Sequence, residues 1–422
     1  MASVAFCSPL PPEKTGIATY ARAVLDGFDE IGFSDRHDLT TVWPINARGL
    51  ARIAAADVAV YQIGNNVEFH GAMYGAAVEH PGVVVVHDLS LDGLIGFGLV
   101  RTKARLAESA RREAFDAAPR QLLDTQDPLA IPTASQVARR ARAVIVHSRF
   151  ARDYLRRAGC RTPIFVAPHP LVESDADVAD ARGRRRALRA KFTGRGEIIV
   201  GVAGDLNQSK GISELLEAIA LLRTQVHLVL VGRTSSSYDV KAEIARAGVG
   251  RQVSVVANAS DGDFLSWLCS FDVLVNLRFP HRGETSGSLV RAMHAGVPTI
   301  VSGTGTYLEV PEGVVHHIPP GPPDPVELAT AIDRLASDPD LRDRMRAGAE
   351  AYARDELAPR STAAVYEAAI DDAIHLLTDP YRRALGRWAG ALAESGVGPA
   401  DVDQGFGLRY AEGLFEVRDA VR

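Results

Sequence analysis

Residues 271 to 303, FDVLVNLRFPHRGETSGSLVRAMHAGVPTIVSG, decide the fold. They begin with Phe271 to Leu277, a short apolar run rich in β-branched residues, which predicts a buried strand. A polar loop containing proline and glycine follows, and residues 289–295 then have the composition of a helix. A glycine ends this helix, and residues 299–301 form a second apolar strand. The stretch therefore predicts one strand–loop–helix–strand unit of an α/β sheet.

The predicted helix begins at a group of small residues that suits an anion. Thr285, Ser286, Gly287 and Ser288 precede its apolar part, and Ser and Thr are preferred at helix N-termini. The first-turn amides and the positive end of the helix dipole make such a place favourable for phosphate. Glu284 stands directly beside it and could accept hydrogen bonds from sugar hydroxyls. The pattern fits a nucleotide-sugar site, and the alternative is an ordinary α/β unit without a ligand.

This stretch resembles the donor-site signature of retaining glycosyltransferases of family four (glycosyl transferases group one), which have the GT-B fold. Glu284 fills the first acidic position of that signature. Arg291, seven residues later, stands where the family usually has a second glutamate that holds the nucleotide ribose. The resemblance therefore implies a sugar-binding role for Glu284. It leaves open how Arg291 and its surroundings hold the ribose.

A second motif in this half of the chain concerns the diphosphate. Lys210 lies between a predicted strand and a predicted helix and resembles the pyrophosphate-binding lysine of the family. The family usually has an arginine five or six positions earlier, where this chain has Asp205 and Gly204. Arg278 directly follows the strand before Glu284, so we expect its guanidinium to replace the missing arginine. Arg282 in the same loop is the other candidate, and a plain surface arginine is the alternative.

Length and composition limit the classes of protein to which the chain can belong. The chain has 422 residues, which suggests two or three domains at roughly 150 residues each. Its net charge of −5 argues against a nucleic-acid partner, and its three widely spaced cysteines form neither a zinc motif nor a disulfide framework. No apolar run approaches the roughly 18 residues of a membrane span, and no signal peptide is recognisable. We therefore expect a cytoplasmic protein.

The first half of the chain also alternates strand and helix candidates, which indicates a parallel sheet covered on both faces. Ligands of such sheets bind beyond the carboxyl ends of the strands. Gly16 follows the first strand and resembles the glycine loop of GT-B enzymes, although a plain turn explains it equally well. His87 and Asp88 follow the strand VVVV, where family members often carry a histidine that faces the transferred sugar. The alternative is a strand-end histidine with an internal partner. The strand candidates are residues 2–7, 39–42, 58–62, 83–86 and 143–147.

Two further patterns have simple explanations. Residues 101–120 are rich in Arg and Lys, which favours a solvated helix face and leaves open a peripheral contact with the inner face of a membrane. Three D-x-D triplets suit helix caps and turns better than metal binding, so we expect no metal site. The triplets are Asp175–Asp177, Asp261–Asp263 and Asp338–Asp340.

These observations predict a GT-B architecture, with two doubly wound Rossmann-like domains that face each other across a cleft. We expect an N-terminal acceptor-side domain in residues 1–175 and a C-terminal nucleotide-sugar domain in residues 190–370. Residues 371–422 would form a helical extension that crosses back or caps the protein. The connection between the domains would lie in residues 167–196, which contain an arginine-rich run.

The resemblance implies a retaining, metal-independent, hexosyltransferase-like enzyme of polysaccharide or glycoconjugate biosynthesis, which needs no cofactor besides its nucleotide-sugar donor. The acceptor could be a glycan, a lipid-linked sugar or a small molecule. A GT-B nucleotide-sugar epimerase and a non-catalytic nucleotide-sugar-binding partner remain as alternatives. The expected catalytic residues are His87, Lys210, Arg278 and Glu284. The expected binding residues are Gly16, Asp88, Thr285, Ser286, Gly287, Ser288 and Arg291.

Overall fold

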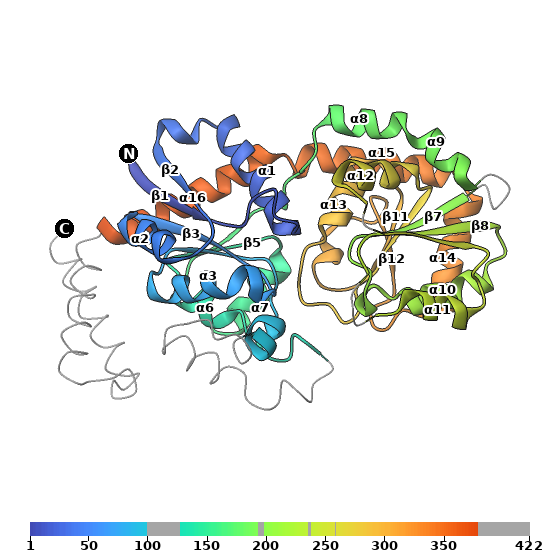
Figure 1. Ribbon diagram of the computed structural model, residues 1–422, viewed down its shortest axis with the longest axis horizontal. Coiled ribbons are helices and arrows are strands. Elements are labelled where there is room, and N and C mark those ends of the chain that lie inside the picture. The colour runs from blue at the N-terminus through green and yellow to red at the C-terminus, as the bar shows by residue number, and fades with distance from the viewer. Residues whose placement is uncertain (99–126, 193–197, 235–237, 258, 379–422) are drawn as a thin grey trace. The chain divides into compact units, whose positions relative to one another are not determined.

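The computed structural model describes residues 1–98, 127–192, 198–234, 238–257 and 259–378. The chain divides into two compact units, Met1–Ile370 and Asp371–Arg422, and the architecture below is that of the first unit. Figure 1 shows that this unit contains two separate β-sheets, each flanked by helices. We call residues 1–169, with the first sheet, the N-terminal lobe, and residues 198–356, with the second sheet, the C-terminal lobe.

The first sheet has six parallel strands in the order β2-β1-β3-β4-β5-β6. Its strands are β1 (Ala2–Cys7), β2 (His37–Val42), β3 (Val58–Ile63), β4 (Val83–Val86), β5 (Ala143–Val146) and β6 (Ile164–Val166). The described helices of this lobe are α1 (Gly16–Glu30), η1 (Phe33–Asp35), α2 (Ala47–Ala55), α3 (Val67–Glu79), η2 (Gly93–Gly98), α6 (Ser135–Arg140) and α7 (Arg149–Arg157).

The second sheet repeats this plan with the order β12-β11-β10-β7-β8-β9. Its strands are β7 (Ile198–Ala203), β8 (Val226–Val231), β9 (Val253–Val256), β10 (Val273–Asn276), β11 (Thr299–Ser302) and β12 (His316–Ile318). Its helices are η5 (Gln208–Lys210), α10 (Ile212–Leu221), α11 (Val240–Ala247), α12 (Asp261–Ser270), α13 (Gly287–His294), η6 (Gly305–Glu309), α14 (Pro325–Ser337) and α15 (Pro339–Glu356). The predicted pair of doubly wound parallel sheets is confirmed.

Both faces of the second sheet are covered, which explains why its strands are continuous apolar runs. Val200 and Val202 of β7 pack with α10 and α14 on one face. Ile199 and Ala203 point to the other face and pack with α12. The predicted strand Phe271 to Leu277 is correct in place but longer than β10, because Phe271 and Asp272 belong to the turn after α12.

The strand orders fix where each lobe can hold a ligand. In the first sheet the order reverses between β1 and β3, and in the second it reverses between β7 and β10. Neighbouring crossovers leave the sheet in opposite directions at such a switch point and open a crevice at the carboxyl ends of the strands. The loop before α1 lies at the first crevice. The loops that carry Lys210 and Glu284 lie at the second.

The segment between the lobes contains three short helices, α8 (Asp175–Gly183), α9 (Arg185–Arg189) and η4 (Ala190–Phe192). The D-x-D triplets act as helix caps, as predicted. Asp177 completes a capping box with Ser174 at the start of α8. Asp263 bonds the cap Ser260 of α12, and Asp338 caps α15.

The last described helix, α16 (Pro359–Thr378), returns to the first sheet. Tyr366 Oη lies 2.7 Å from Tyr20 Oη and 3.1 Å from Gln62 Nε2. Glu367 pairs with Arg36. Residues 359–370 therefore pack against the N-terminal lobe. Residues 379–422 and the basic stretch 101–120 lie outside the described residues.

Candidate active site

Lys210 projects from η5 into the interior at the end of β7. The residue is only 2% exposed, and its Nζ donates a hydrogen bond of 2.6 Å to Ala203 O. Burial lowers the pKa of Lys210 well below its ordinary value, and the charge of Arg278 acts in the same direction, whereas Asp205 and Glu284 oppose it. These interactions place Lys210, Arg278 and Glu284 in one electrostatic cluster.

Gly204 allows this close arrangement. Its φ of +102° is a conformation that side chains rarely adopt. A Cβ at this position would lie 3.1 Å from Lys210 Nζ and 2.9 Å from Ser288 Oγ. Where the family usually has an arginine, the neighbouring Asp205 instead accepts hydrogen bonds from Arg233 at 3.0 and 3.2 Å.

Arg278 and Glu284 form an ion pair, with Arg278 Nε 3.1 Å from Glu284 Oε1. Both side chains are largely buried, at 16% and 20% exposure. The backbone N–H of Arg278 donates to Ser302 Oγ at the end of β11, and its Nη1 donates to Leu277 O. Arg278 is therefore held beside both Lys210 and Glu284. This position suits the role that we expected from its place after the strand.

The N-terminus of α13 has the predicted cap. Ser286 Oγ accepts from the N–H of Leu289, and Asn276 Nδ2 of β10 donates to Ser286 Oγ at 3.1 Å. The helix starts at Gly287, two residues earlier than its apolar part suggested. The amides of Gly287 and Ser288 belong to the first turn, where N–H groups have no partner within the helix.

Arg291 is engaged away from this cluster. Its guanidinium pairs with Glu173 and lies over the ring of Phe264, 4.5 Å from the ring centroid. Its side chain is 14% exposed and that of Glu173 is 11% exposed. These contacts hold the Arg291 side chain in place, and the binding role expected for it stays a prediction.

His87 lies in a group of rings around the buried Tyr20 in the N-terminal lobe. The ring centroids of His87, His147 and His169 are 4.7, 5.0 and 5.0 Å from that of Tyr20. Burial, followed by the effect of His147, lowers the pKa of His87 well below its ordinary value. Burial also lowers the pKa of His147 to about 3 and that of His169 to about 4. The three imidazoles are therefore neutral at pH 7.

The hydrogen bonds of these histidines fix their tautomers. His87 Nε2 lies 2.8 Å from Gln62 Oε1 in the assigned amide orientation, so a neutral ring carries its proton there and presents Nδ1 as an acceptor. His147 Nδ1 donates to Ala167 O, and His169 Nδ1 donates to Pro170 O. Each ring thus has a hydrogen-bond partner within the protein, as in the structural alternative considered for His87. Each ring also retains a second nitrogen that can accept a hydrogen bond.

Asp88 lies next to His87, and its Oδ2 accepts from the N–H of Asn65 at 2.9 Å. Burial raises the pKa of Asp88 to about 7, and the charge of Glu284 from the other lobe adds to the effect. Asp88 and Glu284 therefore belong to the same neighbourhood. Gly16 is the first residue of α1, and a Cβ there would meet nothing within 4 Å, so the structure does not require glycine at this position.

Two neighbours of the expected residues escaped the sequence analysis. His147 directly follows β5, and His169 follows β6. A Cβ on Gly287 would lie 3.7 Å from His169 Nε2. His169 therefore brings the N-terminal lobe close to the start of α13. The available signal was the position of both residues just after strands, which was noted for His87 alone.

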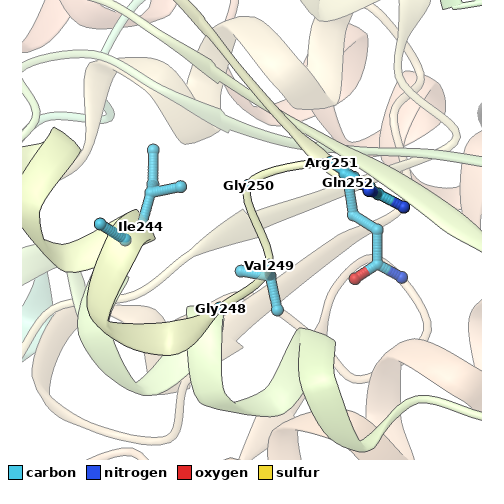
Figure 2. A pocket seen from close by; sticks show the side chains of 7 residues that line it. Ile244, Gly248, Val249, Gly250, Arg251 and Gln252 are labelled. Carbon is cyan, nitrogen blue, oxygen red and sulfur yellow. The ribbon is translucent and has the colours of Figure 1, made fainter.

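A cavity of about 480 Å³ lies beside this contact. His147 and His169 line it from the N-terminal lobe, and Thr285, Ser286 and Tyr307 line it from the C-terminal lobe. The cavity thus adjoins the N-terminus of α13. A larger hollow, of about 660 Å³, lies after α11 and is shown in Figure 2. It is lined by Ile244 and Ala245 of α11 and by residues 248–252 after this helix. The sequence analysis selected none of them, and we assign the hollow no role.

Within the described ranges, no group of three or more His, Cys, Asp or Glu side chains is arranged to hold a metal ion. In the same part of the chain, no helix combines the length and apolar character needed to cross a membrane.

Comparison with known sequences finds a family match over the C-terminal lobe. Residues 184–352 match the family model of glycosyl transferases group 1. Alpha-D-kanosaminyltransferase of Streptomyces kanamyceticus is 29% identical over 227 residues, 52% of this chain and 57% of that protein. D-inositol 3-phosphate glycosyltransferase of Streptomyces griseus is 26% identical over 347 residues, 72% of this chain and 71% of that protein. The match to the kanosaminyltransferase thus spans little more than half of its length.

Comparison with solved structures extends the likeness over both lobes. HepE of Anabaena, solved with UDP and glucose, superposes with a TM-score of 0.60 at 17% identity, covering 88% of this chain and 100% of that one. Sucrose-phosphate synthase of Thermosynechococcus elongatus gives the same score and identity over 92% and 100% of the two chains. The predicted GT-B fold is confirmed. The sequence match to glycosyl transferases group 1 over residues 184–352 thus lies in a chain whose fold resembles GT-B structures over both lobes.

Proposed function

We propose that the protein is a retaining, hexosyltransferase-like enzyme that moves a sugar from a nucleotide sugar to an acceptor hydroxyl. The observation that carries this proposal is the cluster of Lys210, Arg278 and Glu284 at the crevice between β7 and β10, beside the N-terminus of α13. Two cations and a helix N-terminus suit a diphosphate, and the carboxylate between them suits sugar hydroxyls.

The chemistry follows from where charge develops. As the bond from sugar to diphosphate breaks, the leaving group gains negative charge and the sugar becomes oxocarbenium-like. Lys210, Arg278 and the amides of residues 285–288 would stabilise the leaving group without reorganisation. The bound diphosphate would also raise the pKa of Lys210, because a nearby anion favours the ammonium form. Glu284 would hold the sugar hydroxyls.

The N-terminal lobe would supply the other wall of the sugar site. The neutral ring of His87 presents Nδ1 as an acceptor, and Asp88 lies close enough to Glu284 for their charges to interact. A neutral acceptor suits a sugar hydroxyl without adding a negative charge opposite the diphosphate. Exclusion of water by the two lobes would limit hydrolysis of the donor.

The neighbours suggest where a search for substrates should begin. HepE was solved with UDP and UDP-glucose, so a nucleoside-diphosphate hexose is the first donor class to test. Several sequence relatives are named for transfer to small cyclitol acceptors, 2-deoxystreptamine and D-inositol 3-phosphate. We propose small polyhydroxylated molecules as the first acceptor class, before glycans and lipid-linked sugars.

A thermal-shift screen with a panel of nucleotide sugars tests binding first, because a ligand of the native state raises the melting temperature. Donors that bind are then incubated with and without acceptors. Release of nucleoside diphosphate, with a product whose anomeric configuration matches the donor by NMR, supports the proposal. Inversion at a ring carbon without transfer would indicate an epimerase, and binding without turnover would indicate a non-catalytic partner. An inverted anomeric centre would contradict retention.

We also propose that the reaction needs no divalent metal, since Lys210 and Arg278 can neutralise the diphosphate. Activity should therefore persist in excess chelator. Loss of activity in chelator that manganese or magnesium restores would contradict this part of the proposal.

A further inference from the structure

The loop that ends in Glu284 is docked against the N-terminal lobe. The carbonyl oxygen of Arg282 accepts hydrogen bonds from the N–H groups of Leu89 and Ser90, at 2.9 and 3.3 Å. A Cβ on Gly283 would lie 2.4 Å from Leu89 Cδ1, and Gly283 has a φ of +73°. The segment after β4 therefore contacts the loop after β10 in two ways, through backbone hydrogen bonds to Arg282 and through the Leu89 side chain packed on Gly283.

Arg282 adds a bidentate ion pair to this junction. Its Nε and Nη2 lie 3.0 Å from Asp92 Oδ1 and 3.0 Å from Asp92 Oδ2, respectively. Hydrogen bonding to Asp92 raises the pKa of Arg282. Burial opposes ionisation of Asp92, but its bonds with Arg282 and Asn65 outweigh this and lower its pKa. Both partners are therefore charged, in the fork geometry that makes Arg–carboxylate pairs strong.

The carboxylate of Asp92 is itself held in place by Asn65. Asn65 Nδ2 donates to Asp92 Oδ1 at 2.6 Å, and its Oδ1 accepts from the N–H of Leu94 at 3.0 Å. The N–H of Asn65 also binds Asp88 Oδ2. One asparagine after β3 thus fixes the segment after β4, including the partner of Arg282.

The same arginine connects this junction to Glu284. The N–H of Arg282 donates to Glu284 Oε2 at 2.7 Å, while Arg278 binds Oε1. The backbone donor, the backbone acceptor and the guanidinium of Arg282 are therefore all engaged. Two of these three contacts reach the N-terminal lobe, and the third orients the carboxylate.

We propose that Arg282 is a positioning residue that makes the orientation of Glu284 depend on the docked N-terminal lobe, through the pair with Asp92. The inference rests on the proposed function, in which Glu284 binds the sugar. The ion pair fixes the backbone of Arg282, and its N–H then holds Glu284 Oε2 in place. When the junction opens, Glu284 loses that orientation, so the site recognises the sugar only in the docked state.

A second contact between the lobes, made by Glu309, provides a matched control. Glu309 of η6 accepts hydrogen bonds from the N–H groups of Arg149 and Phe150 at the start of α7, at 3.0 and 2.6 Å. This contact also joins the lobes through a carboxylate, but it involves neither Arg282 nor Glu284. Glu309→Gln should therefore loosen this contact locally while the Arg282–Asp92 pair stays closed, so the orientation of Glu284 should be kept.

The first measurement is independent of any ligand. Hydrogen exchange is followed in Asp92→Asn and Arg282→Gln, with Glu309→Gln as the control. Peptides that cover residues 88–91 and 278–286 should lose protection together in the first two variants, since Leu89, Ser90 and Arg282 share bonds. In Glu309→Gln the loss should occur around residues 149–151. Unchanged protection of residues 278–286 in Asp92→Asn and Arg282→Gln would overturn the proposed coupling.

The second measurement compares the affinities for UDP and UDP-glucose by calorimetry. Asp92→Asn and Arg282→Gln should reduce the preference for the sugar-bearing ligand about tenfold, keep the affinity for UDP within about twofold, and show no further loss when combined. Asp92→Glu should restore part of the preference, and Glu309→Gln should retain it. A wild-type protein that binds neither ligand would count against the proposed donor class, with hydrogen exchange still deciding the coupling. A wild-type preference that both variants retain would overturn the positioning role alone.

Discussion

The two lobes share one architecture and differ in charge at the same place. Each has a six-stranded parallel sheet with one switch point, and each collects polar side chains beyond the carboxyl ends of its strands. In the C-terminal lobe these are the ionic groups of Lys210, Arg278 and Glu284. In the N-terminal lobe they include His87, His147 and His169, and burial keeps all three uncharged at pH 7.

This comparison indicates that the strand order determines where a site lies, whereas the side chains determine the charge of the ligand that the site can bind. A crevice with two cations suits an anionic leaving group. A crevice lined by neutral imidazoles suits hydroxyls, which exchange hydrogen bonds without net charge. The following predictions test this division of labour, beginning with the largest expected effect.

Removal of the buried Lys210 side chain should have the largest effect on turnover. We expect Lys210→Ala to lower turnover by about 10²–10³-fold, the range for the loss of one preorganised charge-stabilising donor. Steady-state kinetics with the selected donor measure the effect, and Lys210→Met preserves most of the buried volume as a test of folding. Lys241→Ala, at an exposed lysine of α11, serves as control. Near-normal turnover in a folded Lys210 variant would remove Lys210 from the mechanism.

Arg278→Lys keeps the charge and removes the fork, so it tests whether the diphosphate needs a bidentate partner. Activity should fall by well over about tenfold, and affinity for nucleoside diphosphate should fall with it.

Arg282 provides the contrast, because its variants should lose sugar preference and keep diphosphate affinity. If Arg278→Lys and Arg278→Ala retain most activity while Arg282→Ala loses affinity for the diphosphate, Arg282 is the phosphate ligand and Arg278 is not.

Glu284→Gln should separate sugar binding from nucleotide binding. We expect affinity for the nucleotide sugar to fall about tenfold, the size of one charge-assisted hydrogen bond, while affinity for the diphosphate stays nearly constant. Calorimetry with both ligands gives the two values. An equal loss for both would show that Glu284 serves the nucleotide or the fold.

The uncharged histidines should make the free energy of unfolding depend on pH. The pKa of His147 is about 3 in the folded protein and near its ordinary value when unfolded, so the unfolded chain binds more protons between these limits. The free energy of unfolding should therefore fall as pH drops from about 6.5 to 3, by up to roughly 1.4 kcal/mol per pH unit for each such histidine.

Denaturant titrations of wild type and His147→Gln from pH 7 to 4 test this, and the variant should have the flatter profile. Equal slopes in the two proteins would mean that His147 is already protonated in the folded state.

The sequence predicted the ionic crevice better than the neutral one, for a physical reason. Lys210 and Glu284 sit within a few residues of a strand end and a helix start, so local patterns located them. Strand ends also pointed to His87. The grouping of His147 and His169 around Tyr20 depends on packing between distant segments, which no local pattern contains.

Ion pairs show the same limit of prediction from local sequence patterns. Arg278 could be ranked above Arg282 because it follows its strand directly, and the structure places it beside Glu284. The partner of Arg282 lies 190 residues earlier in the chain, and that of Arg291 is Glu173, also from a separate segment. Such pairs depend on how whole segments dock, so the sequence alone did not reveal the pairing of Arg291 with Glu173.

The return of α16 to the first sheet has a consequence for biosynthesis. Tyr366, fully buried between Phe6 and Phe28, shares hydrogen bonds with Tyr20 and Gln62, all of them made hundreds of residues earlier. The N-terminal lobe therefore lacks part of its core until α16 has left the ribosome. During translation the six-stranded sheet of this lobe therefore stays without one of its packing helices, whereas the later lobe, whose elements are contiguous in sequence, can finish first.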